Sequence, residues 1–227
     1  MNRELFFPCL KRQPINHYYS AHGRFYAASN YQSNYDKVSE DCLHRCVYCD
    51  ATEKECGGER FSLDHFRPKD VFINKFNGIL VQHPYNLHLS CQKCNVLKSK
   101  DWHGCENTIN GYNYSSGKGY VDRFREDLHK FVKVSADGRI YVKAMDQPHP
   151  KNPAQYMIER MHLNRPNRVF IRQKRVITKV VNDIEDLLAQ MTEETTLHWR
   201  TGTKSGDECM QQIIDVEAFR TRFISIK

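Results

Sequence analysis

The 227-residue sequence has no uninterrupted run of about 18 apolar residues, so no segment is expected to cross a membrane. The N-terminal residues lack the basic region and the apolar stretch that mark a secretory signal. Internal repeats and low-complexity tracts are absent as well. These absences predict a cytoplasmic protein of one domain or of two closely packed domains.

The composition adds two constraints. The formal net charge of +7 agrees with a polyanionic partner such as nucleic acid but does not identify one. The nine cysteines fit a reducing compartment, in which thiols stay free or bind metal. Five of them belong to no paired motif and are expected to be free thiols: Cys9, Cys42, Cys56, Cys105 and Cys209.

The remaining four cysteines form two Cys-x-x-Cys pairs. They are Cys46 and Cys49, and Cys91 and Cys94. A two-residue spacer lets both thiolates of a pair bind one ion, and two pairs supply the ligands of a closed tetrahedral zinc site. Since such a site has no open coordination position, the zinc is expected to be structural. Two redox-active motifs are the alternative reading, and Cys42 or His44 could compete with Cys46 as a ligand.

The insert between the two pairs carries an acid and an imidazole side by side, Asp64 and His65. Apolar neighbours predict a short strand here, which Arg67 and Pro68 end. Because adjacent strand residues point to opposite faces, the two side chains can serve one site only if the strand is bent or if one acts through a metal ion. Residues 86–89 are predicted as the partner strand and residues 91–100 as a short helix.

This order of motifs resembles that of the HNH endonucleases. It reads Cys-x-x-Cys, Asp-His, Asn-Leu and Cys-x-x-Cys-Asn-x-x-Lys, and it covers roughly a quarter of the chain. The resemblance implies a ββα-metal fold in which His65 is the general base and Asn86 orients it through the backbone. It also implies that Asp64 and Asn95 ligate the catalytic metal ion. An amide ligand favours a hard ion, Mg²⁺ or Mn²⁺.

The chemistry of phosphodiester hydrolysis is consistent with these residues. A histidine with a pKa of about 6.5 is largely neutral at cytoplasmic pH and can accept a proton from water. An Mg²⁺ ion held by Asp64 and Asn95 would keep open positions for phosphate oxygens. Lys98 follows Asn95 by one helical turn and could contact a neighbouring phosphate, whereas an ordinary solvated lysine is the alternative.

Residues 1–45 are aromatic and polar, without strand alternation, and predict a loop or short helix that leads into the zinc knuckle. Their aromatic side chains either pack on the knuckle or stack on unpaired bases, and we favour packing. These side chains are Tyr18, Tyr19, Phe25, Tyr26, Tyr31 and Tyr35.

The C-terminal half predicts a β-hairpin followed by helices. Val132 and Val134 face Ile140 and Val142 across a turn at Asp137-Gly138. Helical periodicity then appears in residues 153–163, from 166 to about 195, where one apolar stripe is expected, and from 207 to about 223.

The first part of the long helix is basic and its second part is acidic. No Asp or Glu interrupts the segment from Arg165 to Lys179. We interpret this segment as a nucleic-acid surface, with a solvated helix of uneven charge as the alternative. The arginines assigned to the surface are Arg165, Arg168, Arg172 and Arg175.

The sequence therefore predicts an α+β fold: a lead-in over residues 1–45, a zinc-stabilised ββα-metal module over 46–105, and a β-hairpin with a helical region over 106–227. The expected activity is metal-dependent cleavage of DNA. Short strings, among them DHFRPK and LNRPxxVxxR, also resemble the HNH nuclease of Septu-type anti-phage defence systems, which implies a partner ATPase. A ribonuclease acting on tRNA-type substrates and a non-catalytic zinc-dependent nucleic-acid-binding protein remain alternatives.

Overall fold

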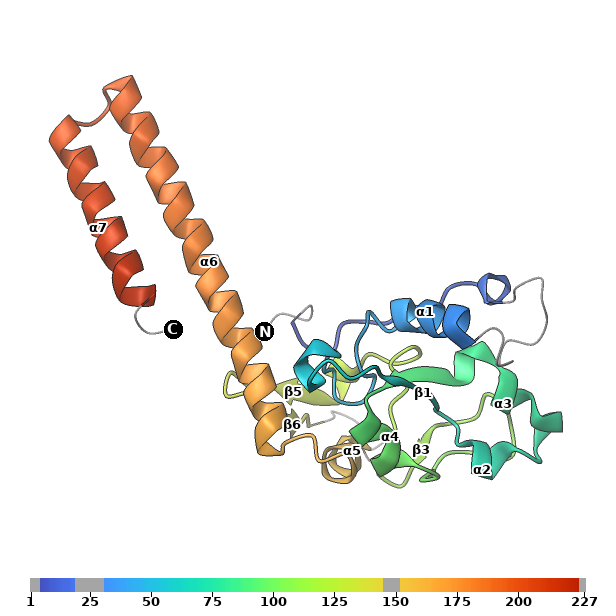
Figure 1. The fold of residues 1–227 in the computed structure, drawn as a ribbon. Helices are drawn as coiled ribbons and strands as arrows, with labels where there is room; N and C mark the ends of the chain where they lie inside the picture. The colour runs from blue at the N-terminus through green and yellow to red at the C-terminus, as the bar shows by residue number, and fades with distance from the viewer. Residues whose placement is uncertain (1–4, 19–30, 145–151, 225–227) are drawn as a thin grey trace. The chain divides into compact units, whose positions relative to one another are not determined.

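The computed structural model describes residues 5–18, 31–144 and 152–224 (Figure 1). The chain divides into two compact units, residues 1–173 and residues 174–227. The first unit mixes helices with small antiparallel sheets, so the expected α+β class is confirmed at that level. Among the described residues, no helix combines the length and the hydrophobicity of a bilayer span.

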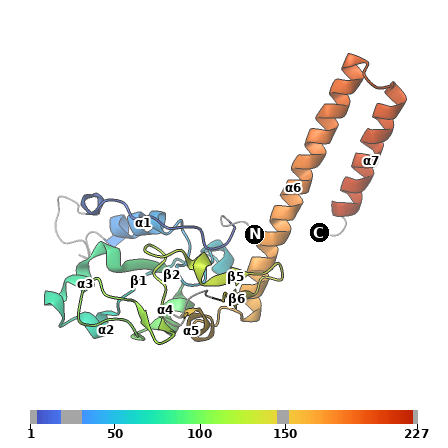
Figure 2. The same ribbon diagram turned by 180° about the vertical axis from the view of Figure 1, so that it is seen from behind.

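Two short strands and a helix lie at the centre of the first unit (Figures 1 and 2). Strand β1 (Ser62–His65) pairs antiparallel with β2 (Leu87–Ser90), with Leu63 opposite Leu89. Helix α4 (Gln92–Lys98) follows β2 after one residue and contacts β1. Leu63, Leu87 and Leu89 are buried, as the alternation of apolar residues predicts. The expected strand–strand–helix order is therefore present.

The segment between the two strands contains helices α2 (Lys69–Phe72) and α3 (Ile79–Gln82). Phe66 and Phe72 both meet Trp102 edge-on, with ring centroids 5.8 Å apart in each pair. The guanidinium of Arg67 lies over the Trp102 ring and donates to the carbonyls of Cys105 and Gly111. This apolar and cationic cluster joins the insert to the loop that follows α4.

The aromatic residues of the N-terminal segment pack inside the protein where they are described. Helix α1 (Tyr31–Asp41) lies against β2. Tyr18 and Tyr35 are buried, and Arg60 covers the Tyr35 ring at 3.8 Å, so packing is confirmed for these two. Tyr19, Phe25, Tyr26 and the side chain of Tyr31 lie outside the described residues.

The turn at Cys46–Cys49 is stabilised by the next residue, Asp50, whose side chain is fully buried. Its backbone has a φ of 65°, and its carboxylate accepts from the Phe7 N–H at 3.0 Å and from Arg45 at 2.9 Å. The buried guanidinium of Arg123 lies 3.4 Å from the second carboxylate oxygen. A buried charge of this kind is stable only because cations and N–H groups surround it.

Two further hairpins complete the sheets. Strands β3 (Tyr114–Ser115) and β4 (Lys118–Gly119) form a short one. Strands β5 (Val132–Val134) and β6 (Ile140–Val142) pair with Val132 opposite Val142, which confirms the predicted hairpin. Short 3₁₀ helices occur at Ile15–His17, Lys54–Cys56, Phe76–Gly78, Pro84–Asn86 and Leu128–Lys130.

Three helices form the C-terminal part: α5 (Ala154–Arg160), α6 (Pro166–Thr201) and α7 (Gly206–Ile224). Helix α6 continues beyond the predicted end near residue 195, because no helix-breaking residue occurs before Gly202. Gly202 adopts a φ of 67°, and the N–H of Thr203 returns to the carbonyl of His198, an arrangement that ends helices with glycine. Ser205 and Glu208 then cap α7 reciprocally.

Replacing Gly138 with alanine should destabilise the protein more than the same replacement at a glycine whose added Cβ meets no other atom. Gly138 has a φ of +77°, and an added Cβ would lie 2.5 Å from the Val169 carbonyl oxygen on α6. Gly58 provides a matched control, since its φ is +83° and nothing lies within 4 Å of an added Cβ. We expect Gly58→Ala to cost about 1–2 kcal/mol and Gly138→Ala to cost about 1–3 kcal/mol more.

Urea denaturation of the two variants measures this difference. Equal midpoints would show that the close approach of the β5–β6 turn to α6 adds nothing to the loss of stability.

Candidate metal centre and active site

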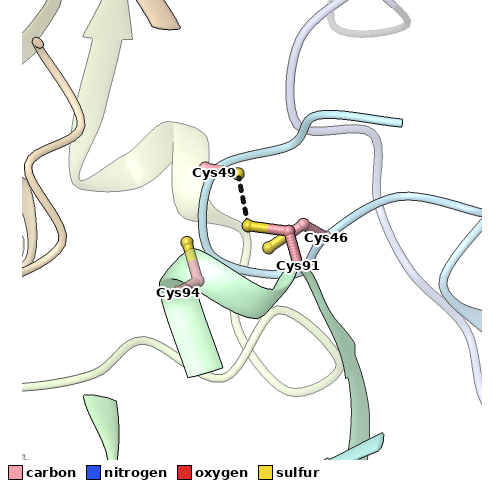
Figure 3. Close-up of side chains that lie close together, drawn as sticks. All are labelled: Cys46, Cys49, Cys91 and Cys94. Carbon is pink, nitrogen blue, oxygen red and sulfur yellow. Dashed lines mark hydrogen bonds between the residues drawn. The ribbon is translucent and has the colours of Figure 1, made fainter. Parts of the chain in front are cut away.

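Four cysteines from two separate segments converge at one point (Figure 3). Cys46 and Cys49 precede β1, whereas Cys91 and Cys94 begin α4. All four are buried, and their sulfur atoms lie within 4.8 Å of one another. Cys49 Sγ and Cys91 Sγ are 3.8 Å apart. Tetrahedral zinc with Zn–S bonds of about 2.3 Å also separates its sulfurs by about 3.8 Å. The cluster could therefore hold a metal ion such as zinc.

The ligand set is limited to these four residues. Among residues 5–18, 31–144 and 152–224, no other set of three or more His, Cys, Asp and Glu side chains lies close enough together to hold a metal ion. Cys42 accepts the Leu89 N–H at 3.4 Å, and burial raises the pKa of its thiol to about 11. His44 pairs through Nδ1 with Ser39 Oγ at 2.9 Å. Neither residue competes with Cys46.

A fifth cysteine, Cys56, lies beside the cluster, and the sequence carried no signal for its position. The neighbouring Cys91 side chain lowers the pKa of the Cys56 thiol. Cys56 and Cys91 line one cavity of about 230 Å³, together with Arg165. Cys56 ends a short 3₁₀ helix and belongs to no Cys-x-x-Cys pair, so no spacing rule could have placed it there.

Arg168 faces the sulfur cluster, which corrects the prediction that it contacts nucleic acid. Its side chain is buried, and Nη2 donates to Cys94 Sγ at 3.0 Å while Nη1 donates to the Met161 carbonyl at 2.7 Å. Burial alone would lower the pKa of Arg168, but the neighbouring cysteines outweigh burial and raise it. Four thiolates around a divalent ion carry a net negative charge, and in a buried site this charge needs a cationic partner.

Arg172 is also an interior residue, which corrects its assignment to a nucleic-acid surface. Its side chain is 1% exposed, and it donates to the carbonyls of Gly138 and Leu163 at 2.5 and 2.6 Å. Arg165 is half-buried and lines the cavity beside Cys56. Arg175 is half-buried in the second unit. Carbonyl and sulfur partners therefore replace phosphate for two of the four arginines.

Asp64 on β1 is held through a single carboxylate oxygen. The Tyr48 hydroxyl donates to Oδ2 at 2.5 Å, and the Lys98 ammonium lies 3.3 Å from the same atom. Within the described part of the chain, no hydrogen bond reaches Oδ1 of Asp64. Burial, with the charge of Asp64 next, raises the pKa of Tyr48, so the hydroxyl remains a donor. Oδ1 is thus the oxygen that could ligate a cation.

Lys98 is fully buried, so its expected contact with substrate phosphate is wrong for this conformation. Its ammonium donates to the His65 carbonyl at 2.8 Å in addition to pairing with Asp64. Burial lowers the pKa of Lys98, and the Asp64 carboxylate partly offsets this effect. Lys98 therefore joins α4 to β1 and positions two adjacent site residues.

His65 is half-buried, and its Nε2 lies 3.0 Å from the Val81 carbonyl oxygen. When the ring is neutral, this contact places the proton on Nε2 and the lone pair on Nδ1. Burial lowers the pKa of His65, whereas the Val81 carbonyl and the Asp64 charge act in the opposite direction. The imidazole is therefore neutral near pH 7 and is able to accept a proton.

Asn86 fixes the chain on both sides of His65. Its Oδ1 accepts the Arg67 N–H at 2.8 Å, and its Nδ2 donates to the carbonyls of Arg67 and Leu80 at 3.0 and 2.8 Å. The side chain therefore connects the residues after β1 with the segment that carries Val81. This geometry agrees with the expected positioning role.

Asn95 lies in α4, one turn before Lys98. Its side chain is partly exposed, and no hydrogen bond to that side chain occurs among the described residues. Because residues three apart share a helix face, the Asn95 amide lies on the face from which Lys98 reaches Asp64. An amide oxygen in this position is a suitable ligand for a hard cation.

Comparisons of the chain with protein-family models, with curated proteins and with solved structures found no match. The chemical assignment therefore depends on the geometry described above and on the order of the motifs.

Replacing Cys91 with serine should abolish zinc binding at the cluster and lower the melting temperature, because three thiolates cannot complete a four-sulfur site. Cys42→Ser is the matched control, since Cys42 is also buried but lies outside the cluster. Elemental analysis and thermal unfolding measure both effects. Zinc retention by Cys91→Ser equal to that of the control would contradict a four-sulfur metal site.

Replacing Arg168 with leucine should speed the loss of zinc to a chelator by roughly 10-fold or more, as substitutions next to metal ligands do. Arg172→Leu is the matched control, because Arg172 is similarly buried on the same helix and its guanidinium donates to the oxygen atoms of Gly138, Leu163 and Asn164. Both variants should be less stable, yet only the first should lose zinc faster. Identical rates would show that Arg168 does not stabilise the sulfur cluster.

Proposed function

We propose that this protein is a metal-dependent endonuclease of the HNH type that hydrolyses phosphodiester bonds. The main support is the position of Asp64, which is fixed through one oxygen by Tyr48 of the cysteine turn and by Lys98 of α4. The neutral imidazole of His65 follows it directly on β1. A carboxylate and a base held on a small rigid scaffold are what metal-assisted hydrolysis requires.

The donor set fits a hard divalent cation. Oδ1 of Asp64 and the amide oxygen of Asn95 are hard oxygen ligands, and both elements that carry them are joined through Lys98. An Mg²⁺ or Mn²⁺ ion bound there would supply charge for the phosphate oxygens and for the leaving group. Lys98 and Tyr48 keep the carboxylate in a fixed orientation.

His65 serves as the general base in this proposal. Nε2 is bonded to the Val81 carbonyl, so Nδ1 accepts the proton from the attacking water. Asn86 holds the flanking backbone in place, and burial favours the neutral form of the ring. Asn86 and Lys98 are thus positioning residues, whereas His65 acts on the reacting atoms.

The proposed substrate is DNA, in agreement with the net charge of +7. The short strings that resemble those of Septu-type nucleases further support a role in anti-phage defence alongside a partner ATPase. Incubation of the purified protein with plasmid DNA, linear duplex DNA and tRNA in the presence of Mg²⁺ tests the substrate. Cleavage of tRNA alone would identify a ribonuclease, and failure to cleave any of the three, with or without the ATPase, would contradict the nuclease assignment.

His65→Ala should reduce cleavage by at least about 100-fold, the usual effect of losing a general base. His129→Ala is the matched control, because His129 is also half-buried and its Nε2 also meets a carbonyl, that of Phe6, at 2.9 Å. Rates of plasmid cleavage at saturating Mg²⁺ measure the effect. A His65→Ala protein that cleaves as fast as the control would exclude His65 as the base.

The acid limb of the pH–rate profile should lie below pH ~6.5, the ordinary pKa of histidine. The pKa of His65 is lowered in the folded protein, so the ring stays neutral, and active as a base, until the pH falls through the lowered value. Single-turnover cleavage across the acid range measures this limb. A limb above neutral pH would mean that another group controls the rate.

A further inference from the structure

The loop that follows α4 borders a pocket on the surface of the first unit. The pocket has a volume of about 570 Å³, which lies within the range of small-ligand sites. These residues take no part in the metal centre or in the proposed catalytic steps. The lining includes Asn110, Tyr112, Asn113, Tyr114, Arg125 and Glu126.

Tyr112 presents a large aromatic side chain to solvent at this pocket. The side chain is 62% exposed, and no hydrogen bond to its hydroxyl occurs in the described part of the chain. The backbone beneath it is tightly packed. The Tyr112 carbonyl accepts the Cys105 N–H at 2.8 Å, and a Cβ added at Gly104 would lie 2.6 Å from the same oxygen. An aromatic side chain on such a fixed backbone loses little conformational freedom when a flat ligand stacks on it.

Two further side chains of the pocket have opposite hydrogen-bonding character. Arg125 supplies N–H donors, and its half-exposed guanidinium donates to Asn110 Oδ1 at 3.1 Å. Glu126 supplies a carboxylate, of which Oε2 accepts from the Tyr114 hydroxyl at 2.9 Å. A phosphate group has no donors and would be repelled by Glu126, whereas the edge of a nucleobase carries both donors and acceptors. The pocket therefore suits a base better than a phosphate.

Arg67 connects the pocket to the proposed active site, because it follows His65 by two residues. Its Nη2 donates to the Gly111 carbonyl at 2.6 Å and to Asn113 Oδ1 at 3.1 Å, and both of these residues line the pocket. Two residues of backbone and one arginine side chain span roughly 15 Å at most. A few nucleotides of one strand cover that distance.

We infer that this pocket binds an unpaired nucleobase of the strand that the proposed nuclease cleaves. The base stacks on Tyr112, and its edge meets Arg125 and Glu126. Stacking is available to every base, because each has a flat π face. The inference rests on the proposed function for its substrate, and it narrows that substrate to nucleic acid with an unpaired base near the scissile bond.

Binding of a short single-stranded DNA to the full-length protein, measured by fluorescence anisotropy without added Mg²⁺, tests the pocket separately from cleavage. Tyr112→Ala should weaken binding by roughly 10-fold, as the loss of one stacked base does, and Tyr112→Trp should keep the parent affinity. Tyr141→Ala is the matched control, because Tyr141 is 49% exposed on β6 and lies outside the pocket. Equal affinities of Tyr112→Ala and Tyr141→Ala would overturn the inference, as would a parent protein that does not bind the strand.

An abasic strand of the same length separates the contribution of the bases from that of the phosphates. The parent protein should bind it more weakly than the normal strand, whereas Tyr112→Ala should bind the two strands alike. A parent protein that does not distinguish the strands would exclude a base pocket. Cleavage assays in Mg²⁺ test the proposed function on its own. A protein that binds the strand through Tyr112 but cleaves no nucleic acid would contradict the nuclease assignment and still support the pocket.

Discussion

A cluster of four cysteine sulfurs and the guanidinium that faces it join three segments of the first unit near the candidate active site. The sulfurs join the turn before β1 to the start of α4, and Arg168 adds the beginning of α6 through Cys94. The cluster is also connected to the proposed metal ligand Asp64, because Tyr48 lies within the first Cys-x-x-Cys turn and donates to the Asp64 carboxylate. A metal ion at the sulfurs would therefore determine the position of a carboxylate that does not bind it.

The polar residues around His65 divide into those proposed to act on substrate and those that hold the others in place. Tyr48, Lys98 and Asn86 are buried, and their hydrogen bonds end on Asp64 or on the backbone near His65. Such groups cost free energy to bury, and they are stable here because each is paired. Within the described residues, Asp64 Oδ1 and the Asn95 side chain make no such hydrogen bonds. A rigid site that binds an ion through few protein ligands is expected to keep its ligand atoms unoccupied in this way.

Spacing and alternation in the sequence predicted the parts of this structure that depend on local patterns. The paired cysteines, the strands around Asp64 and Leu87, and the turn at Gly138 all follow such patterns. The burial of Arg168, Arg172 and Lys98, and the partners of their side chains, could not be predicted in this way. A basic segment without acids resembles a phosphate-binding surface, yet sulfur atoms and backbone carbonyls serve as its partners, and only the folded chain brings them there. Tyr48 was missed because nothing in its position within the cysteine turn indicates which carboxylate it meets.

Diffraction from crystals grown with Mn²⁺, recorded at the zinc and manganese absorption edges, would locate both metal sites in one experiment. We expect zinc at the centre of Cys46, Cys49, Cys91 and Cys94, and manganese bound by Asp64 and Asn95 beside the His65 ring. Zinc without any manganese at Asp64, or manganese bound elsewhere on the chain, would contradict a sulfur-anchored scaffold that presents a carboxylate and an imidazole to one catalytic ion.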